Sequence, residues 1–144
     1  DDYKHHYNEH CLDTTRPYPG VAATLEVLQE RGYRLALVTN KPERVSRHIL
    51  EGLKLGRRFS AVVGGNSCAH KKPHPEPLLK ACGDLGVAPS AAVMIGDSRV
   101  DIEAGKNAQL ACVGILGGIG DQDLLKAAAP DRLVDSIEGL LELF

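Results

Sequence analysis

Residues 93–101, which read Val-Met-Ile-Gly-Asp-Ser-Arg-Val-Asp, carry the pattern that decides the fold. Their first part, Val93 to Ile95, is a short apolar run of the kind that forms a strand buried on both faces. Gly96 and Asp97 end that run, and the apolar spacing from Val100 to Ala108 is that of a helix. A buried strand that leads directly into a helix is half of a βαβ unit, so this stretch predicts an α/β fold with a parallel sheet.

The same alternation of strand and helix runs outward from this stretch in both directions. A chain that alternates in this way forms right-handed crossovers, with a parallel sheet covered by helices on both faces. We therefore expect a three-layer, Rossmann-like α/β domain. The predicted strands are 35–38, 61–64, 93–95, 111–115 and 133–134, and the predicted helices are 21–31, 41–53, 75–85, 100–108, 123–128 and 137–143.

The composition is that of an ordinary soluble domain. The chain has 144 residues, of which 43% are hydrophobic and 25% are charged, and this length is enough to bury a core without disulfides or metals. No apolar run approaches the about 20 residues that span a bilayer. The net charge is −2, aromatic residues make up 4%, and tryptophan is absent, so we expect neither a nucleic-acid nor a membrane partner.

The four cysteines, at positions 11, 68, 82 and 112, form no Cys-x-x-Cys pair. Their irregular spacing predicts free thiols in a reducing compartment, and hence a cytoplasmic protein. Cys68-Ala69-His70 could be half of a metal site, but no second half with suitable spacing follows.

The start of the chain is predicted to form a separate unit. Residues 3–15 contain no helix breaker and predict a helix, whereas residues 16–20, Arg-Pro-Tyr-Pro-Gly, predict a rigid connector. We therefore expect two parts, residues 1–15 and residues 16–144. The chain begins with Asp1 rather than methionine, so we expect it to be a piece of a longer protein.

Polar clusters follow the predicted strands, at the carboxyl ends where ligands bind in parallel sheets. The first is Thr39-Asn40-Lys41, in which a hydroxyl and the N–H groups of a helix start can bind an anion. The second is residues 70–77, His-Lys-Lys-Pro-His-Pro-Glu-Pro, where prolines would hold a lysine ammonium in a set position, and a point positive charge suits phosphate. Taken alone, the first could be a plain helix cap, with Asn40 as the N-cap, and the second a solvated basic turn.

The third cluster contains two acids four residues apart. Asp97 directly follows the strand at 93–95, and Asp101 returns to the same face of the following helix. Two carboxylates so placed can bind Mg²⁺, directly or through water, although the same pair could be an N-cap with a first-turn acid. Hydroxyl, lysine and paired carboxylates together predict a site for phosphate and magnesium, which are the parts that phosphoryl transfer needs.

These clusters resemble the motifs of the haloacid dehalogenase superfamily of phosphohydrolases. Residues 37–42 resemble its second motif, residues 72–75 its third and residues 96–101 its fourth. The match runs in order along nearly the whole chain. Within the superfamily the chain looks closest to phosphoglycolate phosphatases, through Thr-Arg-Pro-Tyr-Pro-Gly at 15–20, Thr-Asn-Lys-Pro-Glu-Arg at 39–44 and Lys-Lys-Pro-His-Pro-Glu-Pro-Leu-Leu at 71–79.

The resemblance implies a Mg²⁺-dependent phosphatase that works through an aspartyl-phosphate. In the superfamily the attacking aspartate, and a second aspartate that protonates the leaving oxygen, belong to an Asp-x-Asp-Gly-Thr motif on the first strand. These 144 residues do not contain that motif, and Asp13-Thr14-Thr15 is a poor imitation of it. We therefore expect the nucleophile to lie outside this chain, which alone would be inactive and would bind Mg²⁺ weakly.

The resemblance also assigns a role to each candidate site residue. Thr39 would bind the transferred phosphoryl group through its hydroxyl, with the backbone N–H of Asn40 beside it. Lys72 would be the catalytic lysine that neutralises the charge of the phosphate and the nucleophile, with Lys71 as the fallback. Asp97 would ligate Mg²⁺, and Asp101 would support the ion directly or through a further contact.

The superfamily places its first strand at the centre of the sheet, which here would be between the strands near 34–39 and 93–97. Without that strand, the two flanking strands pair directly, another chain supplies a strand, or a segment outside these residues does. The second outcome includes self-association through the exposed sheet edge, and we favour the third. Residues 1–15 resemble the last helix of a helical cap, which in this superfamily takes part in substrate choice.

Three functions are open for this sequence. The first is a phosphatase that acts on a small phosphorylated metabolite, above all 2-phosphoglycolate. The second is a sugar-phosphate mutase of the same superfamily, and the third is a non-catalytic domain that binds a phosphate ligand or a protein partner. A dinucleotide site is disfavoured because the glycines of 114–120 do not form Gly-x-Gly-x-x-Gly at the start of a helix.

Overall fold

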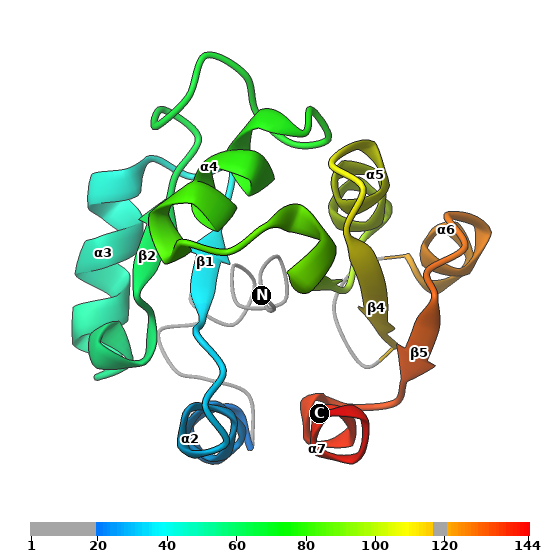
Figure 1. The fold of residues 1–144 in the computed structure, drawn as a ribbon, viewed down its shortest axis with the longest axis horizontal. Helices are drawn as coiled ribbons and strands as arrows, with labels where there is room; N and C mark the ends of the chain where they lie inside the picture. The colour runs from blue at the N-terminus through cyan, green and yellow to red at the C-terminus, as the bar shows by residue number, and fades with distance from the viewer. Residues whose placement is uncertain (1–19, 117–120) are drawn as a thin grey trace.

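The computed structural model describes residues 20–116 and 121–144, in which strands and helices alternate along the chain (Figure 1). The predicted α/β class is confirmed, and the helix predicted at 3–15 lies outside the described residues. The strands are β1 (Ala36–Val38), β2 (Ala61–Val63), β3 (Val93–Gly96), β4 (Ala111–Ile115) and β5 (Arg132–Val134). The helices are α2 (Val21–Glu30), α3 (Glu43–Gly52), α4 (Glu76–Leu85), α5 (Arg99–Asn107), α6 (Gln122–Ala127) and α7 (Leu140–Leu143), with 3₁₀ turns at Gly56–Arg58, Pro89–Ala91 and Ile137–Gly139.

The strands form two parallel sheets. β1 pairs with β2, so that Leu37 lies opposite Val62. β3, β4 and β5 form the second sheet, in which Ile95 lies opposite Val113. Among the described residues, β1 and β3 do not pair with each other. Of the three arrangements expected for the missing central strand, direct pairing of its two neighbours is therefore not found in the described residues.

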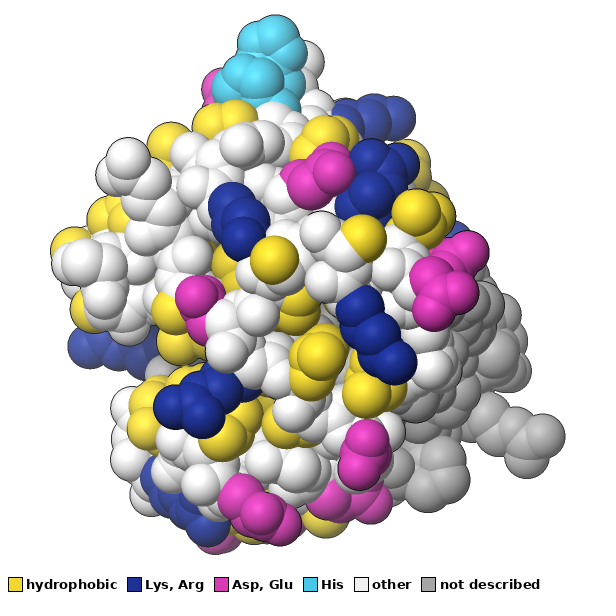
Figure 2. Space-filling view, turned by 90° about the vertical axis from the view of Figure 1, so that its right-hand side faces the viewer, with side chains coloured by type: hydrophobic (Ala, Val, Ile, Leu, Met, Phe, Trp, Pro, Cys, Tyr) yellow, Lys and Arg dark blue, Asp and Glu magenta, His cyan; other side chains and the backbone are white. Residues whose placement is uncertain are grey.

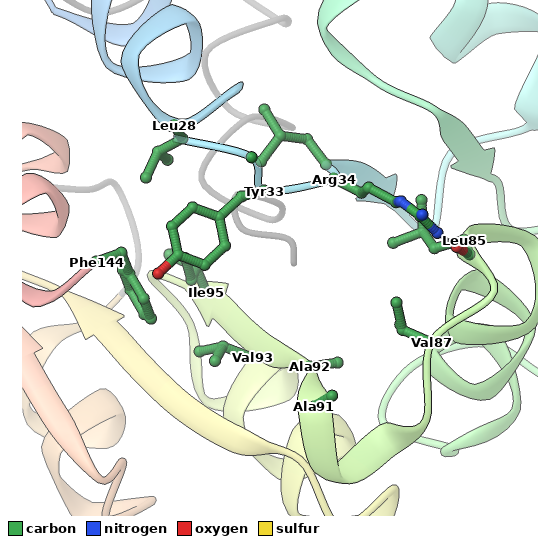
Figure 3. Close-up of a pocket in the computed structure, with 12 residues that line it drawn as sticks. Leu28, Tyr33, Arg34, Leu85, Val87, Ala91, Ala92, Val93, Ile95 and Phe144 are labelled. Atoms are coloured by element: carbon green, nitrogen blue, oxygen red, sulfur yellow. Dashed lines mark hydrogen bonds between the residues drawn. The ribbon is translucent and has the colours of Figure 1, made fainter. Parts of the chain in front are cut away.

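A cavity of about 220 Å³ lies between the two sheets, near the amino-terminal ends of β1 and β3 (Figure 3). It is lined by Leu35, which precedes β1, and by Val93 and Ile95 of β3. Tyr33 and Phe144 also line it, and their rings meet edge to face with 5.7 Å between centroids. The cavity thus lies between the two strands on either side of the expected central strand, at the opposite end from the predicted site.

Side chains on the two faces of the strands enter two separate cores. Leu37 and Ile95 belong to a core that also contains residues of α2, α3 and α7. Val38 and Met94, their neighbours in sequence, belong to a second core with residues of α4, α5 and α6. Helices therefore cover both faces, which is the predicted three-layer arrangement. Within the described residues, no helix combines the length and the apolar character needed to cross a membrane.

Three of the cysteines lie in the described residues, and all three are free thiols. Cys112, in β4, is fully buried, and this burial, with the nearby charge of Asp131, raises its pKa to about 12. Cys68 is half-buried, and burial raises the pKa of its thiol as well.

We expect Cys112 to resist alkylation by iodoacetamide in the folded protein at mildly alkaline pH, while Cys68 reacts faster. Only a thiolate attacks the reagent, and the Cys112 thiol is both inaccessible and almost fully protonated under these conditions. Peptide mass spectrometry with and without urea measures the two rates. Equal rates in the folded protein would contradict this expectation.

Candidate active site

Lys72 lies in a polar cluster at the carboxyl end of β1. It belongs to the loop between β2 and α4, and only 1% of its side chain is exposed. Its Nζ donates to the backbone oxygen of Val38 at 3.0 Å and to Oδ1 of Asp101 at 2.7 Å. Lys72 therefore joins the end of β1 to the first turn of α5. Lys71, the fallback lysine, is exposed.

The carboxylate of Asp101 has partners on both oxygens. Oδ1 accepts from Lys72, and Oδ2 accepts from the hydroxyl of Ser98, the N-cap of α5, at 3.1 Å. Complete burial raises the pKa of Asp101, while the Lys72 ammonium and the hydrogen bond from Ser98 act in the opposite direction. Buried charges are tolerated only with such partners, so in this arrangement Asp101 fixes the ammonium of Lys72.

Gly96, the last residue of β3, leaves room for this carboxylate. A Cβ added at Gly96 would lie 2.4 Å from both Cβ and Oδ2 of Asp101. We expect Gly96→Ala to push the first turn of α5 away from β3 and to lower the free energy of unfolding by about 1–3 kcal/mol, as overpacking of a core does. Urea unfolding measures the change.

Gly83→Ala in α4 is the matched control, because no atom lies within 4 Å of a Cβ added there. Alanine is the better helix former, so this substitution should raise the free energy of unfolding by about 0.5–1 kcal/mol. If Gly96→Ala is as stable as the wild type, the space beside Asp101 is not required.

Thr39 and Asn40 follow β1 and lie beside Lys72. Thr39 is 2% exposed, its N–H donates to the Val63 oxygen at 2.9 Å, and its Oγ1 accepts from the N–H of Lys41 at 3.1 Å. The side chain of Asn40 accepts from the backbone N–H of Lys72 at 3.0 Å and donates to the backbone oxygen of Lys72 at 3.3 Å. The structure thus brings the first two predicted clusters together.

Asn40 is not the N-cap of α3, so that prediction was wrong. The helix begins at Glu43 with Pro42 as its N-cap, and the N–H of Glu43 donates to Oδ1 of Asn66 at 2.9 Å. The physical reason is Pro42, because a residue that precedes proline is disfavoured in the helical region. Lys41 therefore cannot open the helix, and the side chain of Asn40 is available for Lys72.

Gly64 and Gly65 let the loop after β2 run directly against the loop after β1. A Cβ added at Gly64 would lie 2.2 Å from the nitrogen of Glu43, and one added at Gly65 would lie 2.1 Å from the oxygen of Asn40. The hydroxyl of Ser67 accepts from the N–H of Gly64 and donates to Oε1 of Glu43, both at 2.8 Å. These contacts were not predicted from the sequence, although the two consecutive glycines after a strand are a signal that could have found them.

The side chains of His70, Lys71 and His74 in the 70–77 segment are exposed, whereas Pro77 is buried in α4. The rings of His70 and His74 stack with centroids 4.1 Å apart, and Nδ1 of His74 accepts from the N–H of Glu76 at 3.0 Å. Figure 2 shows histidine side chains projecting at one end of the molecule, with Lys, Arg, Asp and Glu side chains spread over the rest of that face. Lys72 is the residue of this loop whose charged group is buried.

Asp97 directly follows β3 and is 1% exposed. Its carboxylate is a hard oxygen ligand of the type that Mg²⁺ prefers. In residues 20–116 and 121–144, no three His, Cys, Asp or Glu side chains form a group that could hold a metal. Since Mg²⁺ is usually bound through one or two carboxylates and keeps several waters, Asp97 fits as one ligand of an ion whose other ligands come from elsewhere.

The model of the haloacid dehalogenase-like hydrolase family matches residues 1–115 of the chain. The chain belongs to this family. It is 38% identical over 141 residues to a phosphoglycolate phosphatase of Haemophilus influenzae, and 40% identical over 139 residues to a phosphoglycolate phosphatase of Escherichia coli. These matches cover 98% and 96% of this chain but 63% and 55% of the relatives, so the chain spans only part of their length.

Solved structures of this family have the same fold. A protein of Haemophilus somnus, described as a predicted phosphoglycolate phosphatase, matches with a TM-score of 0.82 and 37% identity over 88% of this chain and 56% of its own. A protein of Thermotoga maritima, described as a candidate β-phosphoglucomutase, matches with a TM-score of 0.80 and 31% identity over 89% of this chain and 59% of its own. The resemblance drawn from the sequence motifs is confirmed for family and fold.

Proposed function

We propose that this chain supplies the phosphate-binding part of a phosphatase that hydrolyses a small phosphomonoester, 2-phosphoglycolate. The observation that carries the proposal is the buried Lys72 ammonium, held between the end of β1 and Asp101. A fixed positive charge in a site of low dielectric constant attracts a phosphate strongly. The names of the curated relatives support 2-phosphoglycolate as the substrate.

Each residue of the site has one role in this proposal. The hydroxyl of Thr39 and the backbone N–H of Asn40 bind oxygens of the phosphoryl group. Lys72 neutralises the negative charge of the phosphate and the attacking group, and Asp101 keeps the ammonium in place. Asp97 holds Mg²⁺, which when bound neutralises further phosphate charge.

The nucleophile in this proposal lies outside the 144 residues. They contain no Asp-x-Asp-Gly-Thr, and β1 and β3 of the described chain flank a break in the sheet. An aspartate on a strand in that break would attack phosphorus, the bond to the ester oxygen would break, and a second aspartate would give that oxygen a proton. Water would then attack the phosphorus of the aspartyl-phosphate, which releases inorganic phosphate and regenerates the carboxylate.

A sugar-phosphate mutase is the second candidate, because the Thermotoga maritima neighbour is described as a candidate β-phosphoglucomutase. A mutase would form the same aspartyl-phosphate and return the phosphoryl group to a sugar. The two functions therefore differ in their product, which is free phosphate in one case and an isomerised sugar phosphate in the other.

The complete gene product is the protein to assay. With MgCl₂ present, we expect it to release inorganic phosphate from 2-phosphoglycolate faster than from glucose 1-phosphate, and to stop when EDTA is added. Isomerised product from glucose 1-phosphate would favour the mutase. If neither phosphate nor isomer forms, the proposal is overturned and a non-catalytic domain is favoured.

The 144-residue chain by itself should bind Mg²⁺ weakly. Asp97 supplies one carboxylate, and both oxygens of Asp101 already have partners. Without a further carboxylate, the ion does not recover enough of its hydration energy. Isothermal titration calorimetry measures the affinity, and a micromolar dissociation constant would contradict this expectation.

A further inference from the structure

We propose that the side chain of Asn40 is a positioning group for Lys72 and affects the reaction only through that lysine; the proposal rests on the proposed function. Oδ1 of Asn40 accepts from the Lys72 N–H at 3.0 Å, and Nδ2 donates to the Lys72 oxygen at 3.3 Å. One side-chain amide therefore binds both backbone groups of the residue whose ammonium enters the site. An amide has the donor and the acceptor that this requires, whereas a carboxylate or a hydroxyl does not offer the same pair in one plane.

The segment at the carboxyl end of β1 binds both the ammonium and the backbone of Lys72. Nζ donates to the Val38 oxygen at 3.0 Å, while Asn40, two residues later, binds the Lys72 backbone. A free lysine side chain has many rotamers, so its ammonium occupies many positions unless it is fixed. With both ends bound to the same short segment, the ammonium keeps one position relative to Thr39, which lies between Val38 and Asn40.

Neither a helix cap nor a phosphate contact explains why the residue at position 40 has an amide side chain. The N-cap of α3 is Pro42, and the N–H of Glu43, at the start of the helix, donates to Asn66 rather than to Asn40. The contact expected between Asn40 and phosphate uses the backbone N–H, which any residue except proline offers. The side chain of Asn107, at the end of α5, binds the next carbonyl of the loop, that of Pro73, at 2.9 Å. The Lys72–Pro73 segment is thus held from both sides, and Asn40 provides the bonds from β1.

The test is a double-mutant cycle in the complete gene product with Asn40→Ala, Lys72→Ala and the double variant. We expect Asn40→Ala to lower kcat for phosphate release about 10-fold to 10²-fold, with a smaller change in KM, because a displacement of about 1 Å can cost that much. In the Lys72→Ala background, Asn40→Ala should change kcat by less than about twofold. An equal loss in both backgrounds would show that Asn40 acts independently of Lys72 and would overturn the proposal.

Asn66→Ala is the matched control for a lost asparagine hydrogen bond. Asn66 is exposed, lies in the neighbouring loop and binds Glu43. Its removal should leave the N–H of Glu43 without this acceptor and keep kcat within about twofold of the wild type. A loss as large as that of Asn40→Ala would show that the effect comes from general loosening of these loops, and it would overturn the proposal.

The ¹⁵Nζ ammonium signal of Lys72 gives a readout that does not depend on turnover. A buried, hydrogen-bonded ammonium exchanges its protons slowly, so we expect the signal in the wild type and in Asn66→Ala, and its loss in Asn40→Ala. Its absence in the wild type, or its persistence in Asn40→Ala, would overturn the proposal. If the signal behaves as expected while the wild type releases no phosphate, the positioning role stands and the proposed function fails.

Discussion

Replacing Lys72 with alanine is expected to lower kcat for phosphate release from 2-phosphoglycolate by about 10²-fold or more. The ammonium is buried and fixed by Val38 and Asp101, so it needs no reorganisation when charge develops on the phosphate. The substitution also leaves Asp101 buried without its cation, and breaking such a pair costs about 3–5 kcal/mol of stability. Activity and urea unfolding must therefore be measured on the same preparations.

Two further variants distinguish the loss of the Lys72 charge from a general loss of stability. Lys71→Ala removes an exposed lysine one residue earlier, and we expect little change in kcat or in the free energy of unfolding. Lys72→Met combined with Asp101→Asn removes both buried charges, so this double variant should be more stable than Lys72→Ala but no more active. Equal and small losses from Lys71→Ala and Lys72→Ala would show that the catalytic lysine was assigned wrongly.

Asp97→Asn is expected to lower phosphate release by about 10³-fold or more, because a bound metal ion supplies several kcal/mol of charge stabilisation. Asparagine keeps the shape of this buried side chain and removes its charge. Since burying a charge is costly, the folded state should not lose stability. The measurement is kcat over a range of MgCl₂ concentrations, and the concentration needed for half-maximal rate should rise.

Asp84→Asn is the control for loss of a carboxylate. Asp84 lies on α4 and forms an exposed ion pair with Lys80 at 3.3 Å, so the substitution should leave both kcat and the MgCl₂ dependence unchanged. An Asp97→Asn protein with wild-type kcat and wild-type MgCl₂ dependence would contradict the assignment of Asp97 as a ligand.

Local patterns predicted the strands and helices well because the strands are covered on both faces. The run at 93–95 was predicted as a strand, and the structure has β3 at Val93–Gly96. Its successive residues enter different cores, so the whole run must be apolar. The start of α3 was predicted wrongly, because Asn40 and Pro42 are both residues that favour a helix start. The residue before a proline is disfavoured in the helical region, and this restriction on Lys41 places the start after Pro42.

The contacts of the site could not be predicted from local patterns. The bonds from Lys72 to Val38 and Asp101 join residues 34 and 29 positions apart. Because ligands bind at the carboxyl ends of parallel strands, the sequence predicted that these clusters lie close together, but it did not predict which atoms bond to which. The bonds between the side chain of Asn40 and the Lys72 backbone depend on how closely two loops approach, which Gly65 permits.

The division of the strands into two sheets bears on the order in which the molecule assembles. One sheet and the helices α3 and α4 come from a continuous stretch, residues 36–85, and the other sheet with α5 and α6 comes from residues 93–134. Contacts between near neighbours in sequence form before distant ones. The bonds from Lys72 to Asp101 and from Asn107 to Pro73 cross from one stretch to the other. In the proposed function, phosphate binding would therefore depend on docking of the two stretches, and a substitution that weakens docking would impair it without touching the ligand.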